Sequence, residues 1–518
     1  MFRQIEEFSE GKAMGFEVEP IIINTDHLSV ATPTNELWEN RSAAYSMYDA
    51  PEIPKCSIMV QGYNRLHKTR YCVECILKYT QDVDYELILV DNGSNDGTYE
   101  FFQSVPYEKK QIIRVTKNIG AGYPLHHVKR IFRGKYFVSI SNDIYVTKNW
   151  LSNLLKCYES DTKIGYAMPV SSNVSNFQQV DFDYKNFDEM QKKAAAFNIS
   201  NPLKWEERMR LISMICVWSR QVIDIVGWFD GAFVHDFGED DMAARLRRAG
   251  YKMMLCRDTW ICHDHDFRNM EDKDPAAFAA SLESGRATYR EKYHGIDAWE
   301  DISNFEMTLL SPLDTIRRPG TALRSLVVDG RCGTPVLEIR NRLKRRGAAQ
   351  IDSFAFTTQA KYYPDLQTVA HQVNCDRIDF IQSHYSNGSF HVVALCEPVN
   401  TYPTPITLLQ RLYDFLVPGG LLLFKLRNTD DFNALLRAAN MGGSSDGDLP
   451  SILPSAEVQA CLKLFGGKDI SITSEQFDLS SEDRNTLLNM LRTLKPAATQ
   501  NDLNMLVTQN FVFQVTKG

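Results

Sequence analysis

The fold is decided by residues 136–151, which read YFVSISNDIYVTKNWL. The apolar run 136–140 predicts a buried strand, and this strand stops at Ser141, Asn142 and Asp143. Open α/β sheets bind ligands beyond the carboxyl ends of their strands. A carboxylate such as Asp143 is a hard oxygen ligand suited to Mg²⁺ or Mn²⁺. The alternative is a plain turn, because Ser, Asn and Asp also end strands.

Similar strand–loop–helix units precede this stretch. Further strands are predicted over 56–60, 85–90 and 112–115, with a helix over 69–79. The loops that follow these strands read QGYNR, DNGSNDGT and NIGAG. Strands that alternate with helices favour a mostly parallel sheet. The polar loops are therefore expected to gather along the edge where the strands end.

The composition limits the classes of function. The chain has 518 residues, a net charge of −8 and no basic block, which argues against a nucleic-acid surface. Its start is charged and it has no apolar run of membrane-span length, so a cytoplasmic protein without a membrane span is expected. The eleven cysteines are scattered and odd in number, which favours reduced thiols. Cys72 and Cys75 have the C-x-x-C spacing of zinc ligands, but residues at this spacing also share one face of the predicted helix.

A second α/β pattern begins after a boundary at about 305–316, where prolines interrupt the chain. Its predicted strands are 325–329, 390–395, 421–424 and 510–515, and its predicted helices are 405–416 and 487–494. Residues 441–450, MGGSSDGDLP, are expected to form a flexible loop. The chain is thus predicted to be α/β with two domains.

An ordered set of motifs carries a resemblance to family 2 glycosyltransferases. The motifs are SIMVQGYNR, ELILVDNGSNDGT, NIGAG, ISNDIYVTKNWL, PVSSNVSN, GWFDGAF, FGEDDMAARLRRAGYK and DTWICHDHDF. They cover roughly 55–305, and the Asn-Asp pair at 142–143 resembles the rhamnosyltransferase-like branch. The resemblance implies an A-type nucleotide-sugar transferase fold.

The resemblance also implies which residues hold the donor. The implied nucleotide-sugar contacts are Gln61, Tyr63, Asn64, Asp91, Asn118 and Asn142. Asp143 would bind Mn²⁺ or Mg²⁺ on the diphosphate, and His263 lies where the family has a late metal or diphosphate contact. Ser141 replaces the first acidic residue of the family, which leaves a single carboxylate. On the sequence alone, His263 could equally be a satisfied surface or core histidine.

The catalytic base implied by the resemblance falls on Glu239 or Asp240, since the register is ambiguous by one residue. Both lie, with Asp241, before a predicted helix, where acidic residues are also expected from the helix dipole. One base without a second catalytic carboxylate would make the enzyme an inverting transferase. Trp228 could stack on a sugar, although aromatic residues are more often buried.

The second half resembles a class I S-adenosylmethionine-dependent methyltransferase. The matching residues are FHVVALCEPVN and LLQRLYDFLVPGGLLLFKLRN, from the later half of that fold. Pro335 stands where a cofactor-loop glycine is expected, and Asp352 is the candidate ribose-binding acid after the second strand. We therefore expect a degenerate domain that binds no S-adenosylmethionine and serves acceptor docking or self-association.

The predicted organisation is an N-terminal extension (1–50), a glycosyltransferase domain (51–305) and a methyltransferase-like domain (306–518). The predicted function is metal-dependent, inverting hexosyl transfer from a nucleotide sugar to a bacterial glycan or a protein such as flagellin. Two alternatives remain: a bifunctional glycosyltransferase and methyltransferase, and a non-catalytic protein that binds a nucleotide sugar or a polypeptide.

Overall fold

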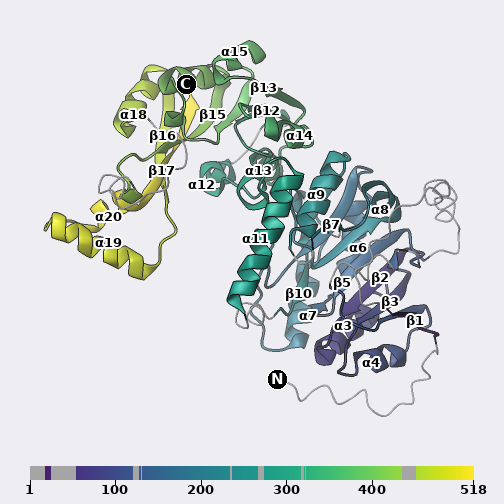
Figure 1. Ribbon diagram of the computed structural model, residues 1–518. Helices are drawn as coiled ribbons and strands as arrows, with labels where there is room; N and C mark the ends of the chain where they lie inside the picture. The colour runs from purple at the N-terminus through teal and green to yellow at the C-terminus, as the bar shows by residue number, and fades with distance from the viewer. Residues whose placement is uncertain are drawn as a thin grey trace. The chain divides into compact units, whose positions relative to one another are not determined.

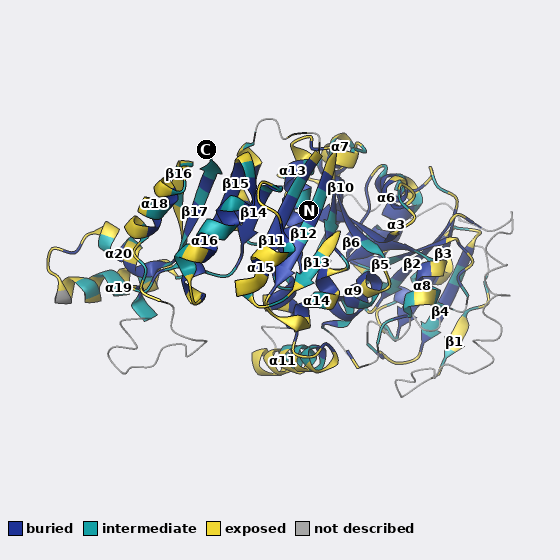
Figure 2. Cartoon of the chain, turned by 90° about the horizontal axis from the view of Figure 1, so that it is seen from above, coloured by how far each residue is buried: buried dark blue, intermediate teal, exposed yellow. Residues whose placement is uncertain are grey.

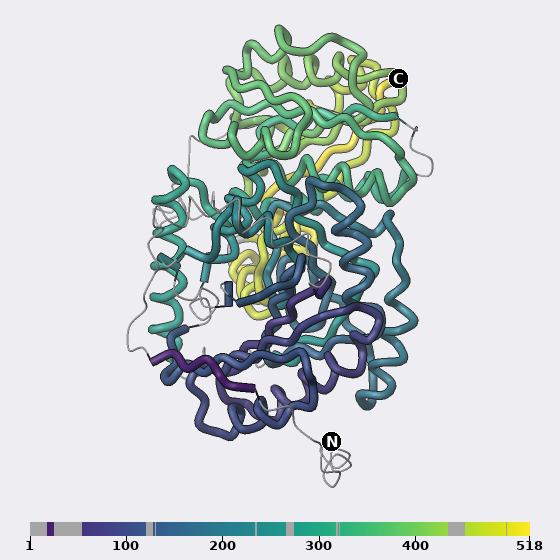
Figure 3. The backbone as a smooth tube through the Cα atoms, turned by 90° about the vertical axis from the view of Figure 1, so that its right-hand side faces the viewer, coloured from purple at the N-terminus to yellow at the C-terminus, as the bar shows by residue number. Residues whose placement is uncertain are grey.

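The structure, a computed structural model, describes residues 18–24, 54–120, 128–129, 131–230, 232–233, 236–265, 274–316, 320, 322–433 and 451–518. The chain divides into two compact units, Met1–Ser303 and Asn304–Gly518. Each unit has its own sheet flanked by helices (Figure 1), and the backbone can be followed from purple to yellow in Figure 3. The predicted α/β class with two domains is confirmed.

The first unit is built on a ten-stranded sheet in the order β1-β4-β3-β2-β5-β9-β7-β10-β6, with β8 paired to β10. The strands are β1 (Ile21–Ile23), β2 (Cys56–Gly62), β3 (Tyr85–Asn92), β4 (Lys110–Val115), β5 (Tyr136–Ser141), β6 (Ile144–Tyr145), β7 (Ile164–Ser171), β8 (Trp205–Arg208), β9 (Ile215–Ser219) and β10 (Lys252–His263). The pairs from β1 to β5 are parallel, whereas β9 runs antiparallel to β5 and β7. The sheet is therefore mostly parallel, with antiparallel strands that the sequence pattern did not predict.

The α-helices of this unit connect and flank the strands. They are α3 (Leu66–Tyr79), α4 (Thr98–Ser104), α6 (Trp150–Tyr158), α7 (Phe187–Phe197), α8 (Arg220–Val226), α9 (Gly238–Arg248) and α11 (Pro275–Lys292). Every residue of β3 and β7 is buried, as expected for strands covered on both faces. Figure 2 shows the strands around β2 and β5 mostly in dark blue and much of the surface of α11 in yellow. Cys72 and Cys75 both lie buried on α3, which fits the helix-face reading of their spacing.

One glycine lets two loops at the sheet edge approach closely. Gly93 has a φ of +81°, and a Cβ there would lie 2.6 Å from the backbone of Lys117 and Asn118. Only glycine tolerates both the left-handed backbone and this contact. The loop after β3, which begins beside Asp91, is thereby packed onto the loop after β4, which carries Asn118.

The second unit contains a seven-stranded sheet in the order β13-β12-β11-β14-β15-β17-β16. The strands are β11 (Ala322–Val328), β12 (Gln350–Thr357), β13 (Gln372–Cys375), β14 (Phe390–Leu395), β15 (Leu416–Arg427), β16 (Gly467–Gln476) and β17 (Thr508–Lys517). The five strands from β13 to β15 are parallel, and β17 is antiparallel to both of its neighbours. Because the chain winds in opposite directions from β11 and from β14, the switch point of this sheet lies between them.

The α-helices of the second unit are α12 (Met307–Leu310), α13 (Thr334–Arg345), α14 (Tyr363–Leu366), α15 (Ile381–His384), α16 (Pro405–Asp414), α18 (Ser455–Leu464), α19 (Ser481–Leu494) and α20 (Gln500–Val507). The helix predicted over 405–416 ends two residues early, and β15 begins at Leu416, ahead of the strand predicted at 421–424. The loop predicted at 441–450 lies outside the described residues, as does the predicted N-terminal extension apart from 18–24.

Candidate active site and metal centre

Asp143 lies just beyond the carboxyl end of β5. The next strand, β6, pairs antiparallel with the end of β10, so that Ile144 lies opposite His263. Asp143 is 6 % exposed, and its backbone oxygen accepts a hydrogen bond of 2.9 Å from the Asp264 N–H. Its side-chain Oδ1 is buried and has no hydrogen-bond partner among the described residues. A buried carboxylate oxygen without a donor is a site for a cation or a ligand.

Two histidines from the end of β10 face this carboxylate. His263 Nε2 lies 3.8 Å from Asp143 Oδ1, and His265 Nδ1 lies 3.5 Å from Asp143 Oδ2. The two imidazole ring centroids are 4.9 Å apart. The sequence reasoning singled out His263 and missed His265. Alternate residues of an extended chain share a face, and that periodicity could have found it.

The neighbours of His263 fix its tautomer. Its Nδ1 lies 3.0 Å from the backbone oxygen of Asn173, and because a carbonyl only accepts, Nδ1 carries the hydrogen. Burial lowers the pKa of His263, against the opposing charge of Asp143, which favours the neutral ring. Nε2 then presents a lone pair toward a carboxylate oxygen. A cation between these two acceptor atoms would relieve their repulsion.

The cluster of Asp143, His263 and His265 fits a divalent metal. One ligand atom from each residue lies within 4.8 Å of the other two. Burial alone would raise the pKa of Asp143, but the His265 hydrogen bond and the proximity of both histidines lower it overall, which favours the ionised carboxylate. Ser141, which ends β5, offers no second carboxylate, and the two histidines would complete a ligand set instead.

Asp264, between the two histidines, points to other partners. Its Oδ2 accepts a hydrogen bond of 2.8 Å from the Tyr145 hydroxyl and lies 3.3 Å from the ammonium of Lys68. Lys68 also donates to the backbone oxygen of Asp264. These contacts fasten the histidine segment to α3 and β6.

Asp91, near the end of β3, is fully buried and offers one unused acceptor. Its Oδ1 accepts a hydrogen bond of 3.0 Å from the Ser94 N–H. Its Oδ2 finds no hydrogen-bond donor in the described chain and lies 3.9 Å from Arg114 Nε. Burial raises the pKa of Asp91, while Ser94 and Arg114 oppose the shift. An N–H donor of a ligand, such as that of a nucleotide base, would satisfy this oxygen.

Asn64 ties three of the polar loops together. Its backbone N–H donates to Ser94 Oγ at 2.9 Å, and its Oδ1 accepts from the Asn95 N–H at 3.0 Å. Its backbone oxygen accepts from Asn142 Nδ2 at 3.1 Å. The loops after β2, β3 and β5 therefore meet, as expected from a parallel sheet.

The other predicted donor contacts lie along the same edge. Gln61 lies near the end of β2, opposite Ser141, and Tyr63 is 47 % exposed just beyond it. Asn118 Oδ1 accepts hydrogen bonds from Asn92 Nδ2 at 3.1 Å and from the Gly120 N–H at 3.0 Å. Residues 121–127 are not among the described residues, so the rest of the predicted NIGAG loop lies outside them.

Two of the three acids in the first turn of α9 are occupied by positive side chains. Asp240 is buried and accepts hydrogen bonds from two nitrogens of the Arg210 guanidinium. Asp241 accepts from Arg245 Nε at 2.9 Å and from the Tyr293 hydroxyl at 2.7 Å. Both carboxylates therefore hold α9 in place and are poorly available to a substrate.

Glu239 is the remaining acid and has an unusual pKa. Burial, together with the charge of Asp240, raises the pKa of Glu239 to about 8, against a hydrogen bond from the Ser213 backbone. Ser213 closely precedes β9, in which Ile215 lies opposite Ile140 of β5. Glu239 therefore lies at the edge where β5 ends.

Trp228 belongs to the core. It is 7 % exposed and stacks on Trp218, with ring centroids 5.0 Å apart and planes inclined by 19°. The burial alternative is thus the correct one, and the suggestion that Trp228 stacks on a sugar is wrong.

The switch point of the second unit is lined by polar side chains that already have partners. Asp329, just beyond β11, accepts hydrogen bonds from the Tyr402 hydroxyl at 2.5 Å and the Thr358 N–H at 2.7 Å. Glu306 and Lys425 form a buried ion pair with oxygen–nitrogen distances of 2.8 and 2.9 Å. The carboxylates of Asp329 and Glu306 thus already bind partners within the unit.

Two expectations for this unit need correction. Pro335 lies in the first turn of α13, where proline is well tolerated, so it does not by itself distort the loop. Asp352 is the third residue of β12 and pairs opposite Arg324 near the beginning of β11. It therefore lies far from the carboxyl end of its strand, and its prediction as a ribose-binding acid is wrong.

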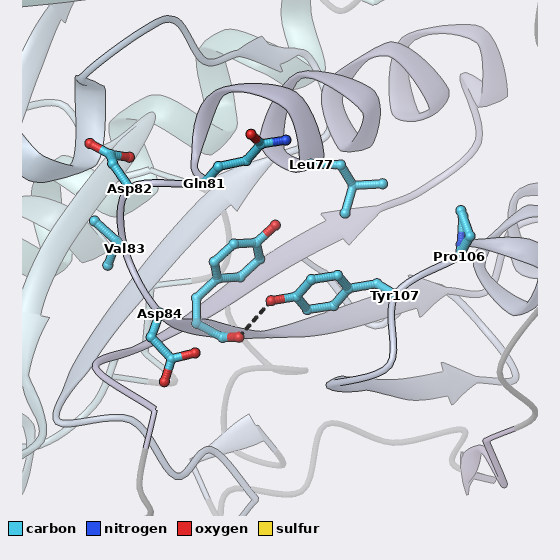
Figure 4. A pocket seen from close by; sticks show the side chains of 8 residues that line it. Leu77, Gln81, Asp82, Val83, Asp84, Pro106 and Tyr107 are labelled. Carbon is cyan, nitrogen blue, oxygen red and sulfur yellow. Dashed lines mark hydrogen bonds between the residues drawn. The ribbon is translucent and has the colours of Figure 1, made fainter.

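A pocket of about 570 Å³ opens at the opposite edge of the first sheet (Figure 4). It is lined by Leu77, Pro106, Tyr107 and residues 81–85. Tyr107 donates a hydrogen bond of 2.7 Å to the backbone oxygen of Tyr85, and Asp84 is paired with Lys109 at 2.7 Å. This hollow lies at the start of β3 and contributes nothing to the site at the strand ends.

Comparison with known proteins finds likenesses over parts of the chain. Residues 57–206, within the first unit, match the model described as glycosyl transferase family 2. Over 159 residues the chain is 21 % identical to the uncharacterised glycosyltransferase YfnE of Bacillus subtilis, which covers 30 % of this chain. The match spans 39 % of the length of that relative.

Two solved structures resemble parts of the chain at TM-scores too low to support an argument. A mannosyltransferase from Pyrobaculum calidifontis, in complex with GDP-Man and Mn²⁺, has a TM-score of 0.36 and 16 % identity over 53 % of this chain and 77 % of its own. A SAM-dependent methyltransferase from Archaeoglobus fulgidus has a TM-score of 0.29 and 13 % identity over 45 % of this chain and 99 % of its own. Among the described residues, no helix combines the length and apolarity needed to cross a bilayer.

Proposed function

We propose that the first unit is a metal-dependent, inverting glycosyltransferase that moves a hexose from a nucleotide-sugar donor to a hydroxyl group. The observation that carries this proposal is the unpartnered Oδ1 of Asp143, which faces Nε2 of His263 with His265 beside it. The family 2 match over residues 57–206 supports it, because that segment contains both Asp91 and Asp143.

The metal would be held by Asp143, His263 and His265, and when bound it would offset negative charge on the departing diphosphate. Two imidazoles in the ligand set favour Mn²⁺ over Mg²⁺, since Mg²⁺ prefers oxygen ligands. Asp91 would accept a hydrogen bond from the base of the nucleotide through its unused Oδ2. The remaining contacts to the donor would come from Gln61, Tyr63, Asn64, Asn118 and Asn142.

Glu239 is the base in this proposal. Its carboxylate takes the proton of the acceptor hydroxyl while the acceptor oxygen bonds to the anomeric carbon. The bond from that carbon to the diphosphate oxygen breaks at the same time, and attack from the opposite face inverts the configuration. Of the two candidates left by the sequence, Asp240 is disfavoured because Arg210 already engages both of its oxygens.

The acceptor is proposed to be a hydroxyl of a bacterial glycan or of a cytoplasmic protein, of which flagellin is an example. The rhamnosyltransferase-like branch rests on the Asn142–Asp143 pair alone. For the second unit we propose a role in acceptor docking or self-association without methyl transfer. The engaged carboxylates at its switch point support that reading.

The test is nucleotide release from a panel of UDP-, GDP-, dTDP- and CDP-sugars with Mn²⁺ or Mg²⁺. We expect release with at least one donor, faster with Mn²⁺, and abolished by a chelator or by Asp143→Ala. Asp183→Ala, at an exposed aspartate of the same unit, is the matched control. No release from any donor, or full activity of Asp143→Ala, would refute the proposed function.

A further inference from the structure

Arg65 lies beside the candidate metal ligands. Its Nη1 is 3.7 Å from Asp143 Oδ2, and 36 % of its side chain is exposed to solvent. Asp143 Oδ2 is also the oxygen that faces His265. A charged guanidinium that is both solvent-accessible and close to a metal ligand can exchange one anion for another.

The backbone that presents Arg65 is strained. Asn64 and Arg65 have φ values of 54° and 59°, so two successive non-glycine residues adopt the left-handed region. Such conformations persist where the surroundings over-determine them, and they gather at functional sites. Here the three hydrogen bonds of Asn64 fix the first residue. The Arg65 backbone oxygen accepts from the N–H groups of Lys68 and Thr69 at 2.9 and 3.0 Å, which fixes the second.

Arg65 is connected to both parts of the proposed donor site. A chain of hydrogen bonds runs from Asp91 through Ser94 to Asn64, and Arg65 follows Asn64 in the sequence. A donor with its base at Asp91 and its phosphates at Asp143 would therefore bring its diphosphate near the Arg65 guanidinium, which lies beside Asp143. Uridine or guanosine alone, without phosphates, would reach only the first part of this path.

The charges point to the same ligand group. A divalent cation with a single carboxylate has a net charge of about +1, and a nucleotide-sugar diphosphate carries about −2 at neutral pH. The guanidinium supplies the missing positive charge, and its planar fork binds phosphate oxygens in pairs.

We propose that Arg65 binds the diphosphate of the donor and, in doing so, leaves Asp143 Oδ2 to the metal. This inference rests on the proposed function and adds a donor-binding residue to it. The competing explanation is that Arg65 only neutralises Asp143 within the folded chain.

The experiment is calorimetric titration of the full chain, with MnCl₂ present, using UDP, GDP, dTDP and CDP and the four matching nucleosides. For the diphosphate that binds, Arg65→Met should weaken affinity about 10–100-fold, the usual value of a hydrogen bond to a charged group. Affinity for the nucleoside should be unchanged. Arg65→Lys should recover part of the loss, because it keeps the charge without the fork. Arg70→Met, on the exposed side of α3, is the matched control and should bind as the wild type does.

A glycine variant separates binding from folding. Arg65→Gly relieves the left-handed backbone, so it should melt at or above the wild-type temperature and still lose diphosphate affinity. The inference is overturned if Arg65→Met binds the diphosphate as tightly as the wild type, or if diphosphate and nucleoside weaken equally. If the wild type binds none of the four diphosphates, the proposed function fails together with the inference. If the wild type binds a diphosphate and the Arg65 variants bind it equally well, the inference about Arg65 fails and the proposed function stands.

Discussion

Replacement of Glu239 by Gln tests the proposed chemistry most directly. The substitution keeps the shape of the side chain and removes the ability to take a proton. We expect kcat for sugar transfer to fall by ~10²–10⁴-fold, the usual contribution of a positioned general base. Binding of the nucleotide sugar should be unchanged, because Glu239 acts on the acceptor.

The pH dependence follows from the pKa of about 8 that burial and Asp240 impose on Glu239. Such a group is ionised to roughly 1 % at pH 6 and roughly 10 % at pH 7. The wild-type kcat/KM should therefore rise about tenfold per pH unit over this range and level off above pH 8. The residual activity of Glu239→Gln should lack this rise.

As the pH rises, the free energy of unfolding should fall while kcat/KM increases. The native pKa of Glu239 is raised above its ordinary value of 4.5, so the unfolded chain releases this proton first as the pH rises. The free energy of unfolding should therefore fall between about pH 4.5 and pH 8. Because Glu239 is partly exposed to solvent, which screens its charge, we expect this fall to be about 1–2 kcal/mol. Glu239→Gln should be more stable than the wild type at pH 8 by about this amount.

The assay pairs initial rates from pH 6 to 9 with urea unfolding of the same proteins. Glu108→Gln, at an exposed glutamate of the same unit, is the control and should match the wild type in both measurements. A wild-type profile that is flat from pH 6 to 8, or a Glu239→Gln variant that transfers sugar at the normal rate, would show that the base lies elsewhere.

Four further outcomes are expected. Mn²⁺ should raise the melting temperature of the wild type but not that of Asp143→Ala, and an equal rise in both would place the metal elsewhere. Asp240→Asn should lower the free energy of unfolding by about 2–3 kcal/mol, because it leaves the partly buried Arg210 without its ionic partner, and a loss below about 1 kcal/mol would contradict the pairing. Lys425→Met should destabilise by a similar amount through the stranded Glu306, and the double variant with Glu306→Gln should recover much of the loss. Calorimetry of the full chain with S-adenosylmethionine should show no binding, and micromolar affinity would overturn the reading of the second unit.

The position of Asp143 at a strand end was predictable because strand and turn propensities are local. A buried run followed by Ser141 and Asn142 is enough to place it. His265 was missed for a different reason. Asp143 is 122 positions away in the chain, and its proximity to His265 depends on the pairing of β6 with β10.

The acidic cluster of α9 shows the same limit. The sequence indicated that one of Glu239, Asp240 and Asp241 serves the helix rather than catalysis, but not which one. Arg210 lies 30 residues from Asp240 and reaches it only through the folded sheet. The role of Glu239 as the base stays a prediction. In the second unit, Asp352 was placed after its strand because the beginning of β12 cannot be read from the residues before it.

The pairing of β6 with β10 makes the proposed metal centre depend on the completed fold. Asp143 lies within the family match at 57–206, whereas both histidines and the acids of α9 lie beyond its end. A fragment that stops at 206 would keep the proposed nucleoside pocket around Asp91 and lose two metal ligands. Because both histidines lie beyond residue 206, gain of Mn²⁺ affinity would require the rest of the first unit to be present and folded. Mn²⁺ binding would then report whether the first unit is completely folded.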